Sequence, residues 1–319
     1  MSLRPAMVAA IQATPVFLDR DATVERVISL TKEAAGGGAD LVVFPEAFVP
    51  GYPDWVWRTT PWAAPSSGLY ERLLDQSVTV PGPSVDVMAA AAEDAGVYLA
   101  VGIDERDPAG STVYNSLLYL GPDGEILGVH RKLMPTGGER LVWGHGDGSG
   151  LVSFETPFGR VGGLICWENY MPLARVAMYR QGIDIYLAPT WDNSDVWVPT
   201  LQHIAKEGRC YVVSTNSVLR GSDVPEELGA SKIYGGDEDW MSRGNATIVG
   251  PDGTILAGPV RGDETILYAE VDPARVSRER MQFDACGHYA RDDVFTLTVR
   301  GMPTTPREGG PDTSAEPPA

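Results

Sequence analysis

The chain has 319 residues, and its 43 acidic side chains outnumber 25 basic ones, which gives a formal net charge of −18. A surface this acidic repels nucleic acid and anionic membranes, so neither is expected as a partner. No run is long and apolar enough to span a bilayer, and residues 1–7 carry one charge without the long apolar stretch of a signal peptide. These features predict a soluble cytoplasmic protein.

No charge block or proline-rich linker divides the first 300 residues, which we interpret as a single domain, residues 1–300. Residues 301–319 are rich in Pro, Gly and Thr with almost no large apolar side chains, so a disordered tail is expected. Cys166, Cys210 and Cys286 are odd in number and widely separated. This spacing fits neither a disulfide framework nor paired metal ligands, and we interpret Cys210 and Cys286 as structural thiols.

Apolar strands and amphipathic helices alternate in the first part of the chain. The predicted elements are a strand over 7–13, a helix over 23–35, a strand over 41–44, a helix over 84–95, a strand over 97–103, and hairpin strands over 113–120 and 125–130. Gly36–Gly38 ends the first helix, and Pro45 ends the second strand because proline lacks the N–H that a ladder needs. The turn Gly121–Gly124 joins the hairpin strands.

The second part repeats this alternation with shorter strands. The predicted elements are strands over 151–154 and 161–165, a helix after Cys166, a strand over 183–188, a helix over 198–208, and strands over 211–215, 247–249 and 265–271. The Gly- and acid-rich segment Gly221–Trp240 is expected to be a mobile loop. Hairpins interrupt the alternation, so two mixed sheets packed together with helices outside fit better than one parallel sheet. The turns Pro122–Gly124 and Pro251–Gly253 resemble each other weakly, which we interpret as recurrent hairpin chemistry with a hint of internal pseudo-symmetry.

Three polar residues each follow an apolar strand, namely Glu46, Lys132 and Cys166. Taken singly, each has an ordinary interpretation: a surface acid, a solvated cation and an inert core thiol. If their strand ends meet at one rim, they instead supply a base, a cation and a nucleophile. A free thiol has a pKa of about 8.5, so the carboxylate would have to take its proton as it attacks.

Three segments, Phe44–Phe48, Arg131–Thr136 and Leu164–Asn169, resemble the signature regions of the nitrilase superfamily, the carbon–nitrogen hydrolases. The likeness extends from about Ala6 to about Val299, and the residues from Cys166 onward are similar to the nitrilase branch rather than the amidase branches. The resemblance implies an α/β fold of the α+β type, a four-layer αββα sandwich. It also implies a Glu46-Lys132-Cys166 triad, with Glu139 as a supporting glutamate and no cofactor.

The resemblance further implies a small-molecule nitrile as substrate and a homo-oligomer, often a dimer that extends into spirals. We interpret Tyr52, Trp167, Thr190 and Trp191 as substrate-binding residues, and Trp57 as a further candidate for the pocket wall. For the aromatic residues other than Trp167, a role in the buried core is an equally good interpretation. Two departures from the typical pattern are Gly137-Gly138, where many members have a His and a small residue, and Asp292, where Pro or Ser is common.

Charge predicts that the Cys166 thiol is neutral at rest. With Glu46 and Glu139 ionised and Lys132 protonated, the cluster is already negative. A thiolate about 4 Å from a carboxylate would cost ~4 kcal/mol at an effective dielectric near 20, before Lys132 offsets part of it. Proton transfer should therefore accompany the attack on the substrate.

The predicted function is a nitrilase that converts an aromatic, arylaliphatic or aliphatic nitrile to a carboxylic acid and ammonia. An amidase or N-carbamoyl amide hydrolase with the same triad is the main alternative. A Cys–His hydrolase using His145 of the Gly-rich loop is a second, and a scaffold without activity is a third. His130, His145, His203 and His288 are scattered and lack the spacing of metal ligands, so no metal is expected.

Overall fold

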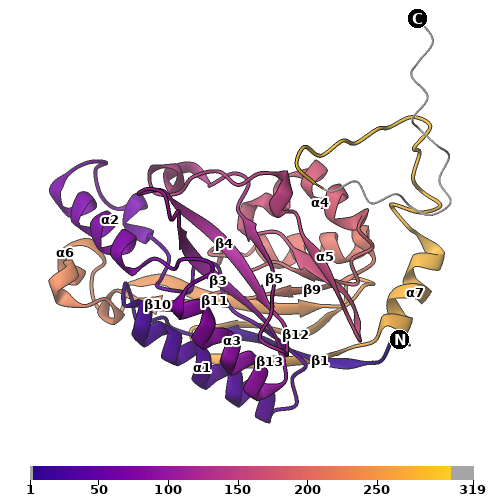
Figure 1. Ribbon diagram of the computed structural model, residues 1–319, viewed down its shortest axis with the longest axis horizontal. Helices are drawn as coiled ribbons and strands as arrows, with labels where there is room; N and C mark the ends of the chain where they lie inside the picture. Colours follow the sequence, from indigo (N-terminus) through magenta and orange to yellow (C-terminus); the bar gives the residue numbers. More distant parts are fainter. Residues whose placement is uncertain (1–2, 303–319) are drawn as a thin grey trace, which may run out of the picture.

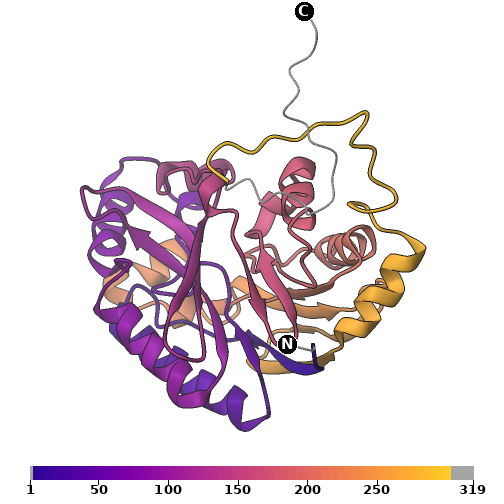
Figure 2. The same ribbon diagram turned by 45° about the vertical axis from the view of Figure 1, so that its right-hand side comes forward.

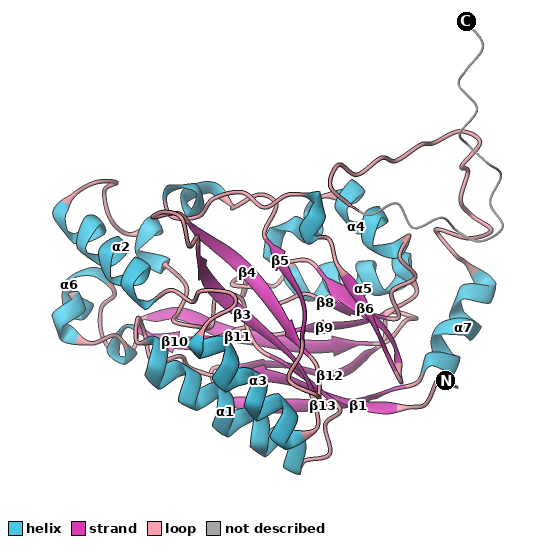
Figure 3. Ribbon diagram, viewed as in Figure 1, coloured by secondary structure: helices cyan, strands magenta, loops and turns pink. Residues whose placement is uncertain are grey.

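The computed structural model describes residues 3–302, so the predicted tail lies outside this range from residue 303 onward. The strands form two mixed sheets packed face to face, with helices on both outer surfaces (Figures 1 and 3). The predicted α/β fold of the α+β type, with αββα layers, is therefore confirmed. Seen from a second direction, the indigo-to-purple helices lie along the lower left of the molecule, and the yellow helix near the end of the described chain lies at the right (Figure 2).

The first sheet contains six strands in the order β13, β1, β2, β3, β4, β5. Their bounds are Thr265–Val271, Ala6–Gln12, Leu41–Val43, Tyr98–Arg106, Val113–Leu120 and Ile126–Arg131. The strands β1, β2 and β3 are parallel, and the other neighbours are antiparallel. Parallel neighbours need a long crossover, which α1 (Arg20–Gly36) supplies for the first pair and α3 (Pro83–Ala95) for the second.

The second sheet contains seven strands, in the order β10, β11, β9, β8, β7, β6, with β12 also paired to β11. Their bounds are Val218–Arg220, Trp240–Val249, Tyr211–Ser214, Ile185–Leu187, Gly159–Gly163, Ser153–Thr156 and Ile255–Arg261. The strands β7, β8 and β9 are parallel. Their crossover helices are α4 (Pro172–Tyr179) and α5 (Trp197–Gly208), which cover the outer face of this sheet.

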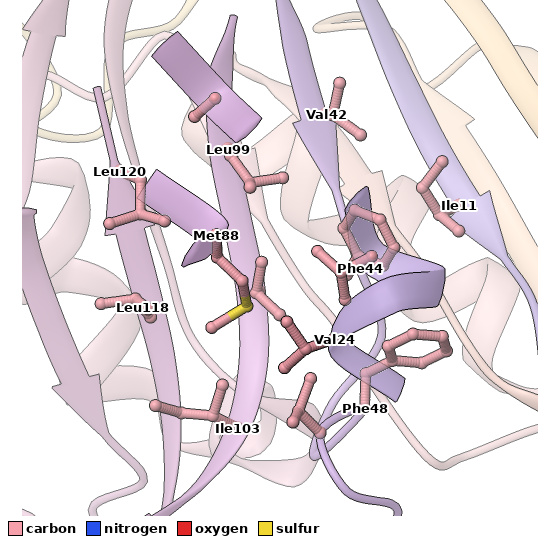
Figure 4. Close-up of a cluster of buried hydrophobic side chains, with 14 of the residues drawn as sticks. Ile11, Val24, Val42, Phe44, Phe48, Met88, Leu99, Ile103, Leu118 and Leu120 are labelled. Carbon is pink, nitrogen blue, oxygen red and sulfur yellow. The ribbon is translucent and has the colours of Figure 1, made fainter. Parts of the chain in front are cut away.

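Three apolar layers hold these four layers of structure together. Between the outer helices and the first sheet, Val24 of α1 and Met88 of α3 pack against Leu99 and Leu118 of the sheet (Figure 4). A second layer lies between the sheets, and a third joins the second sheet to α4 and α5. Strands buried on both faces read as continuous apolar runs, which is why the sequence located most of them.

Local signals set the ends of the long helices. Asp19 caps α1 by accepting a hydrogen bond from the backbone N–H of Ala22 at 3.0 Å, so the helix begins three residues before the predicted start at Thr23. It ends at Gly36, and the N–H of the capping residue Gly37 bonds back to the last turn. Gly96 ends α3 in a left-handed conformation with φ 66°, which glycine adopts without steric cost.

The sequence did not predict α2 (Ala64–Gln76) or α7 (Pro273–Gln282), which each bury only two side chains. The segment Gly221–Trp240, expected to be a loop, contains α6 (Ala230–Ile233) and two short 3-10 turns. Its Tyr234 is only 2% exposed and packs on Phe17, with ring centroids 5.7 Å apart. One buried aromatic side chain thus anchors a segment whose composition alone suggests little structure.

Candidate active site

The predicted polar residues lie together where strands of both sheets end. Glu46 follows β2, Lys132 follows β5 and Cys166 follows β7, and each is almost fully buried, with 1%, 1% and 4% of its surface exposed. Glu139 lies on a short turn, Gly137–Leu141, and is 2% exposed. Ionisable side chains are almost never buried to this degree unless they are paired, so their contacts define the site.

Lys132 is the centre of the cluster. Its Nζ donates to Glu46 Oε1 at 2.7 Å and to Glu139 Oε2 at 2.8 Å, and it lies 5.6 Å from the ring centroid of Trp143. Burial acts to lower the pKa of Lys132, but the negative charges of Glu46 and Glu139 raise it by more, and the net shift is upward. The ammonium is therefore protonated throughout the neutral range.

Glu46 uses only one of its two oxygens for hydrogen bonds. Oε1 accepts from Lys132 and also from Asn115 Nδ2 at 2.7 Å. Oε2 is buried and finds no hydrogen-bond partner within residues 3–302. Burial raises the pKa of Glu46, and Lys132 opposes this shift without cancelling it. An unpartnered carboxylate oxygen with a raised pKa is a suitable acceptor for a proton.

Cys166 occupies a strained backbone position beside the end of β8. Its φ is 52°, in the left-handed region that is costly for a residue with a side chain. Its N–H donates to the Pro189 carbonyl at 2.8 Å, and the Thr190 hydroxyl donates to its sulfur at 3.1 Å. Burial and then the charge of Glu46 raise the pKa of the Cys166 thiol. This direction agrees with the predicted neutral thiol.

The carboxylate of Glu139 accepts hydrogen bonds from three donors. Its Oε2 accepts from Lys132 and from the Thr136 N–H at 2.5 Å, and its Oε1 accepts from the Tyr52 hydroxyl at 2.7 Å. Trp57 Nε1 in turn donates to the Tyr52 oxygen at 3.2 Å. The carboxylate thus keeps one orientation between Lys132 and the aromatic loop.

A cavity of about 370 Å³ opens beside the sulfur. Its lining residues are Tyr52, Trp57, Thr136, Glu139, Cys166, Trp167, Trp191, Asp192, Asn193 and Ser194. Tyr52, Trp167 and Trp191, which the sequence predicted as substrate-binding residues, line this cavity. Thr190, the fourth such prediction, contacts the sulfur but is not among the lining residues. Asp192, Asn193 and Ser194 were missed, because a polar run after a strand gives no distinctive signal.

Comparison with known proteins agrees with this geometry. The carbon-nitrogen hydrolase family profile matches residues 7–281. The chain belongs to this family. It is 47% identical to an aliphatic nitrilase of Sinorhizobium fredii over 92% of this chain and 96% of that relative. It is also 42% identical to a bifunctional nitrilase/nitrile hydratase of Lupinus angustifolius over 93% of this chain and 86% of the relative.

Solved structures support the fold of this carbon–nitrogen hydrolase. A carbon-nitrogen hydrolase from Helicobacter pylori superposes with a TM-score of 0.72 at 24% identity, covering 91% of this chain and 97% of that one. Nit3 of Saccharomyces cerevisiae, a member of branch 10 of the nitrilase superfamily, gives 0.69 at 22% identity, covering 90% and 97%. At these identities the likeness concerns the fold alone.

The departure at Gly137-Gly138 has a steric cause in this hydrolase. A Cβ on Gly137 would lie 2.9 Å from a ring carbon of Trp57, and one on Gly138 would lie 3.2 Å from that ring. Gly137 also has φ 50°, which favours glycine. The two glycines therefore let Trp57 pack directly over the turn that carries Glu139.

A buried pair behind the cluster was not predicted. His130 Nε2 bonds Glu168 Oε2 at 2.9 Å, and His130 Nδ1 bonds the Gly150 carbonyl at 2.9 Å. Glu168 also accepts from the N–H groups of Ile165 and Leu133, at 2.7 and 2.6 Å. Since Ile165 adjoins Cys166 and Leu133 adjoins Lys132, this carboxylate ties the two segments together. Only the three-dimensional arrangement reveals it.

The remaining alternatives find less support in the geometry. His145 is exposed and is not among the cavity-lining residues, so it is poorly placed to activate Cys166. Among residues 3–302 no group of His, Cys, Asp or Glu side chains is arranged to hold a metal ion. Within the same range no helix has the length and apolar character needed to cross a membrane.

Proposed function

We propose that this carbon–nitrogen hydrolase is a nitrilase, which converts an organic nitrile and two waters to a carboxylic acid and ammonia. The observation that carries the proposal is the meeting of Lys132, Glu46 and Glu139 beside the cavity that holds Cys166. The relatives named nitrilases, identical at 40% or more over most of the chain, support the same reaction.

In the first step, the sulfur of Cys166 attacks the nitrile carbon. Glu46 takes the thiol proton through Oε2, its unpartnered oxygen, and a proton reaches the nitrile nitrogen, which gives a thioimidate. An ammonium has three N–H donors, and within the described chain Lys132 gives two of them to Glu46 and Glu139. The third can therefore face the nitrogen as negative charge develops on it.

The second stage uses two waters. Glu46 activates the first, which adds to the thioimidate carbon; ammonia then leaves and a thioester remains. The second water cleaves the thioester, which releases the carboxylic acid and restores the thiol. If the sulfur leaves the tetrahedral adduct before ammonia does, the product is an amide instead. Glu139 holds Lys132 in place through both stages.

The test compares a nitrile with the amide of the same acid. The purified protein is incubated with each, and ammonia and carboxylic acid are both measured. The proposal expects faster turnover of the nitrile, and no turnover of either compound by Cys166→Ala. Faster hydrolysis of the amide would instead favour the amidase or N-carbamoyl hydrolase alternative.

We also propose that the chain forms homo-oligomers, from dimers up to spirals. The support is a set of apolar side chains exposed around α4 and α5, including Leu173 at 68% and Val196 at 64%. Apolar residues gathered at a surface commonly mark an interface. Light scattering coupled to gel filtration measures the assembly directly, and a monomer at all concentrations would contradict this proposal.

A thiol nucleophile that must stay reduced favours the cytoplasm as the location of the protein.

A further inference from the structure

The cavity beside Cys166 is apolar in its walls and negative in its charge. Three indoles, from Trp57, Trp167 and Trp191, line it. Its charged lining residues are Glu139 and Asp192, and no Lys, Arg or His belongs to the lining that the described chain provides. Lys132 lies behind this surface, where its ammonium already bonds two carboxylates. Glu139 is thus paired with a cation, whereas no ion pair neutralises Asp192 within the described residues, so a ligand that enters meets net negative charge.

Asp192 is the residue that adds charge beyond the catalytic cluster. Its Oδ2 accepts from Trp167 Nε1 at 2.9 Å, and its Oδ1 accepts from the Ser194 N–H at 2.8 Å. Its own N–H donates to Thr190 Oγ1 at 2.9 Å. These contacts fix the carboxylate at the cavity edge, and within residues 3–302 no cation pairs with it. Its neighbour Asp195, in contrast, is paired with Arg261 at 2.7 Å.

A fixed charge at the edge of a small cavity acts on every charged group that enters. Low-dielectric walls weaken solvent screening, so like charges repel more strongly than they do in open water. The faces of indole rings attract cations as well. The acidic surface of the whole chain, with its net charge of −18, adds a long-range field of the same sign.

We propose that Asp192 makes the cavity selective for charge, so that it admits neutral and cationic nitriles and rejects anionic ones such as cyanocarboxylates. This inference rests on the proposed function and names its substrate class. The same repulsion acts on the product, because hydrolysis turns a neutral nitrile into a carboxylate anion inside the cavity. Asp192 therefore also promotes release of the product.

The direct test uses two alkylating reagents of nearly equal size, neutral iodoacetamide and anionic iodoacetate. In both reactions the Cys166 sulfur forms a bond to the methylene carbon, iodide leaves, and the thiol proton passes to Glu46 or solvent. The rate at Cys166 is followed by peptide mass spectrometry, which separates it from Cys210 and Cys286. The neutral-to-anionic rate ratio for 2-mercaptoethanol corrects for intrinsic reactivity.

The corrected ratio should favour iodoacetamide by at least about tenfold in the wild-type protein. In Asp192→Asn, which removes the charge and keeps an acceptor oxygen, the ratio should fall several-fold. Asp94→Asn removes one charge from the exposed outer side of α3 and should leave the ratio unchanged. A distorted site would slow both reagents together, so the ratio separates a change of charge from a change of shape.

A second arm tests the nitriles themselves. The isosteric pair 4-cyanobutanamide and 4-cyanobutanoate is assayed by loss of the nitrile group, with inhibition by an added carboxylate product measured alongside. Wild-type protein should prefer the neutral compound, and Asp192→Asn should narrow the preference and bind the product more tightly. Equal ratios in wild type and Asp192→Asn, in either arm, would overturn the inference. Charge-selective alkylation without any nitrile turnover would instead overturn only the proposed function.

Discussion

The two sheets repeat one plan. In each, three parallel strands are followed by antiparallel strands that turn at a Pro-Asp-Gly sequence, which joins β4 to β5 and β11 to β12. The weak resemblance of Pro122–Gly124 and Pro251–Gly253, interpreted from the sequence mainly as recurrent hairpin chemistry, coincides with this repeat. The middle parallel strands, β2 and β8, both end shortly before a proline, Pro45 in one sheet and Pro189 in the other.

The difference between the halves lies in the next residue. Glu46 follows Pro45 and presents an unpartnered carboxylate oxygen, whereas Thr190 follows Pro189 and donates its hydroxyl to the Cys166 sulfur. The same strand ending thus delivers a base in one half and a group that holds the nucleophile in the other. The fold supplies equivalent positions, and the side chain at each position decides its chemistry.

The largest expected effect comes from removing the nucleophile. Cys166→Ala should lower kcat by roughly 10⁴-fold or more, as loss of a nucleophile does in other hydrolases. The side chain is small and borders a cavity, so the free energy of unfolding should change little. Ammonia release and urea unfolding measure the two quantities. Substantial residual turnover would show that another residue attacks the nitrile.

The next effect compares Glu46 with its counterpart. Glu46→Gln removes the proton acceptor and should lower kcat by about 10²- to 10⁴-fold. Thr190→Val removes one hydrogen bond to sulfur and the acceptor of the Asp192 N–H, and it should cost about tenfold or less. Similar losses in both variants would refute the division of roles.

Because burial raises the pKa of Glu46, the pH profile of kcat/KM in the wild type should fall on its acid side with an apparent pKa above the ordinary carboxylate value of about 4.3.

Glu139→Gln should lower kcat by about 10²-fold, because it removes one of the two charges that hold Lys132. Tyr52→Phe serves as the comparison variant, since it removes the donor to the other oxygen of Glu139 and the acceptor of Trp57 Nε1 but leaves the charge on Glu139, and it should cost less. Steady-state kinetics on a neutral nitrile measures both variants. Full activity of Glu139→Gln would contradict its assignment.

The sequence predicted much of this site because its residues follow apolar runs. The strand at 41–44 and the run up to Ile165 located Glu46 and Cys166, and the predicted hairpin strand at 125–130 located Lys132. The left-handed φ of Cys166 and the pairing of His130 with Glu168 depend on contacts between distant segments. The helix α7 was missed for a different reason: its sequence is polar, has no apolar stripe and buries only two side chains.

The buried pair should affect stability in a pH-dependent manner. Burial lowers the pKa of His130, but the charge of Glu168 and its hydrogen bond raise it, and the net shift is upward. The pair's contribution should therefore be fully present below the unfolded pKa of about 6.5 and be lost as pH rises through the folded value. Glu168→Gln should cost about 3 kcal/mol of unfolding free energy at pH 6.

Urea unfolding of wild type and Glu168→Gln between pH 6 and pH 9 measures this difference, which should shrink as pH rises. A constant difference across the range would mean that His130 is not charged in the folded protein. The hydrogen-bond geometry leads to the same expectation of a charged His130. Both partners of its imidazole, a carboxylate and a carbonyl, are acceptors, so both ring nitrogens must carry a proton.

The smallest effect tests whether the two hairpins are equivalent. Gly124 has φ 76° and Gly253 has φ 88°, and a Cβ on either would lie 3.4 Å from its nearest neighbour. Alanine should therefore cost about 1–2 kcal/mol at each, mainly because the left-handed conformation is strained. Gly68→Ala, inside α2 with open space around it, should instead stabilise by up to about 1 kcal/mol. Since the strain is local and nearly equal, Gly124→Ala and Gly253→Ala should lower the urea midpoint by similar amounts. Midpoints that differ widely would show that the two halves support their turns differently. The repeat would then be one of topology alone.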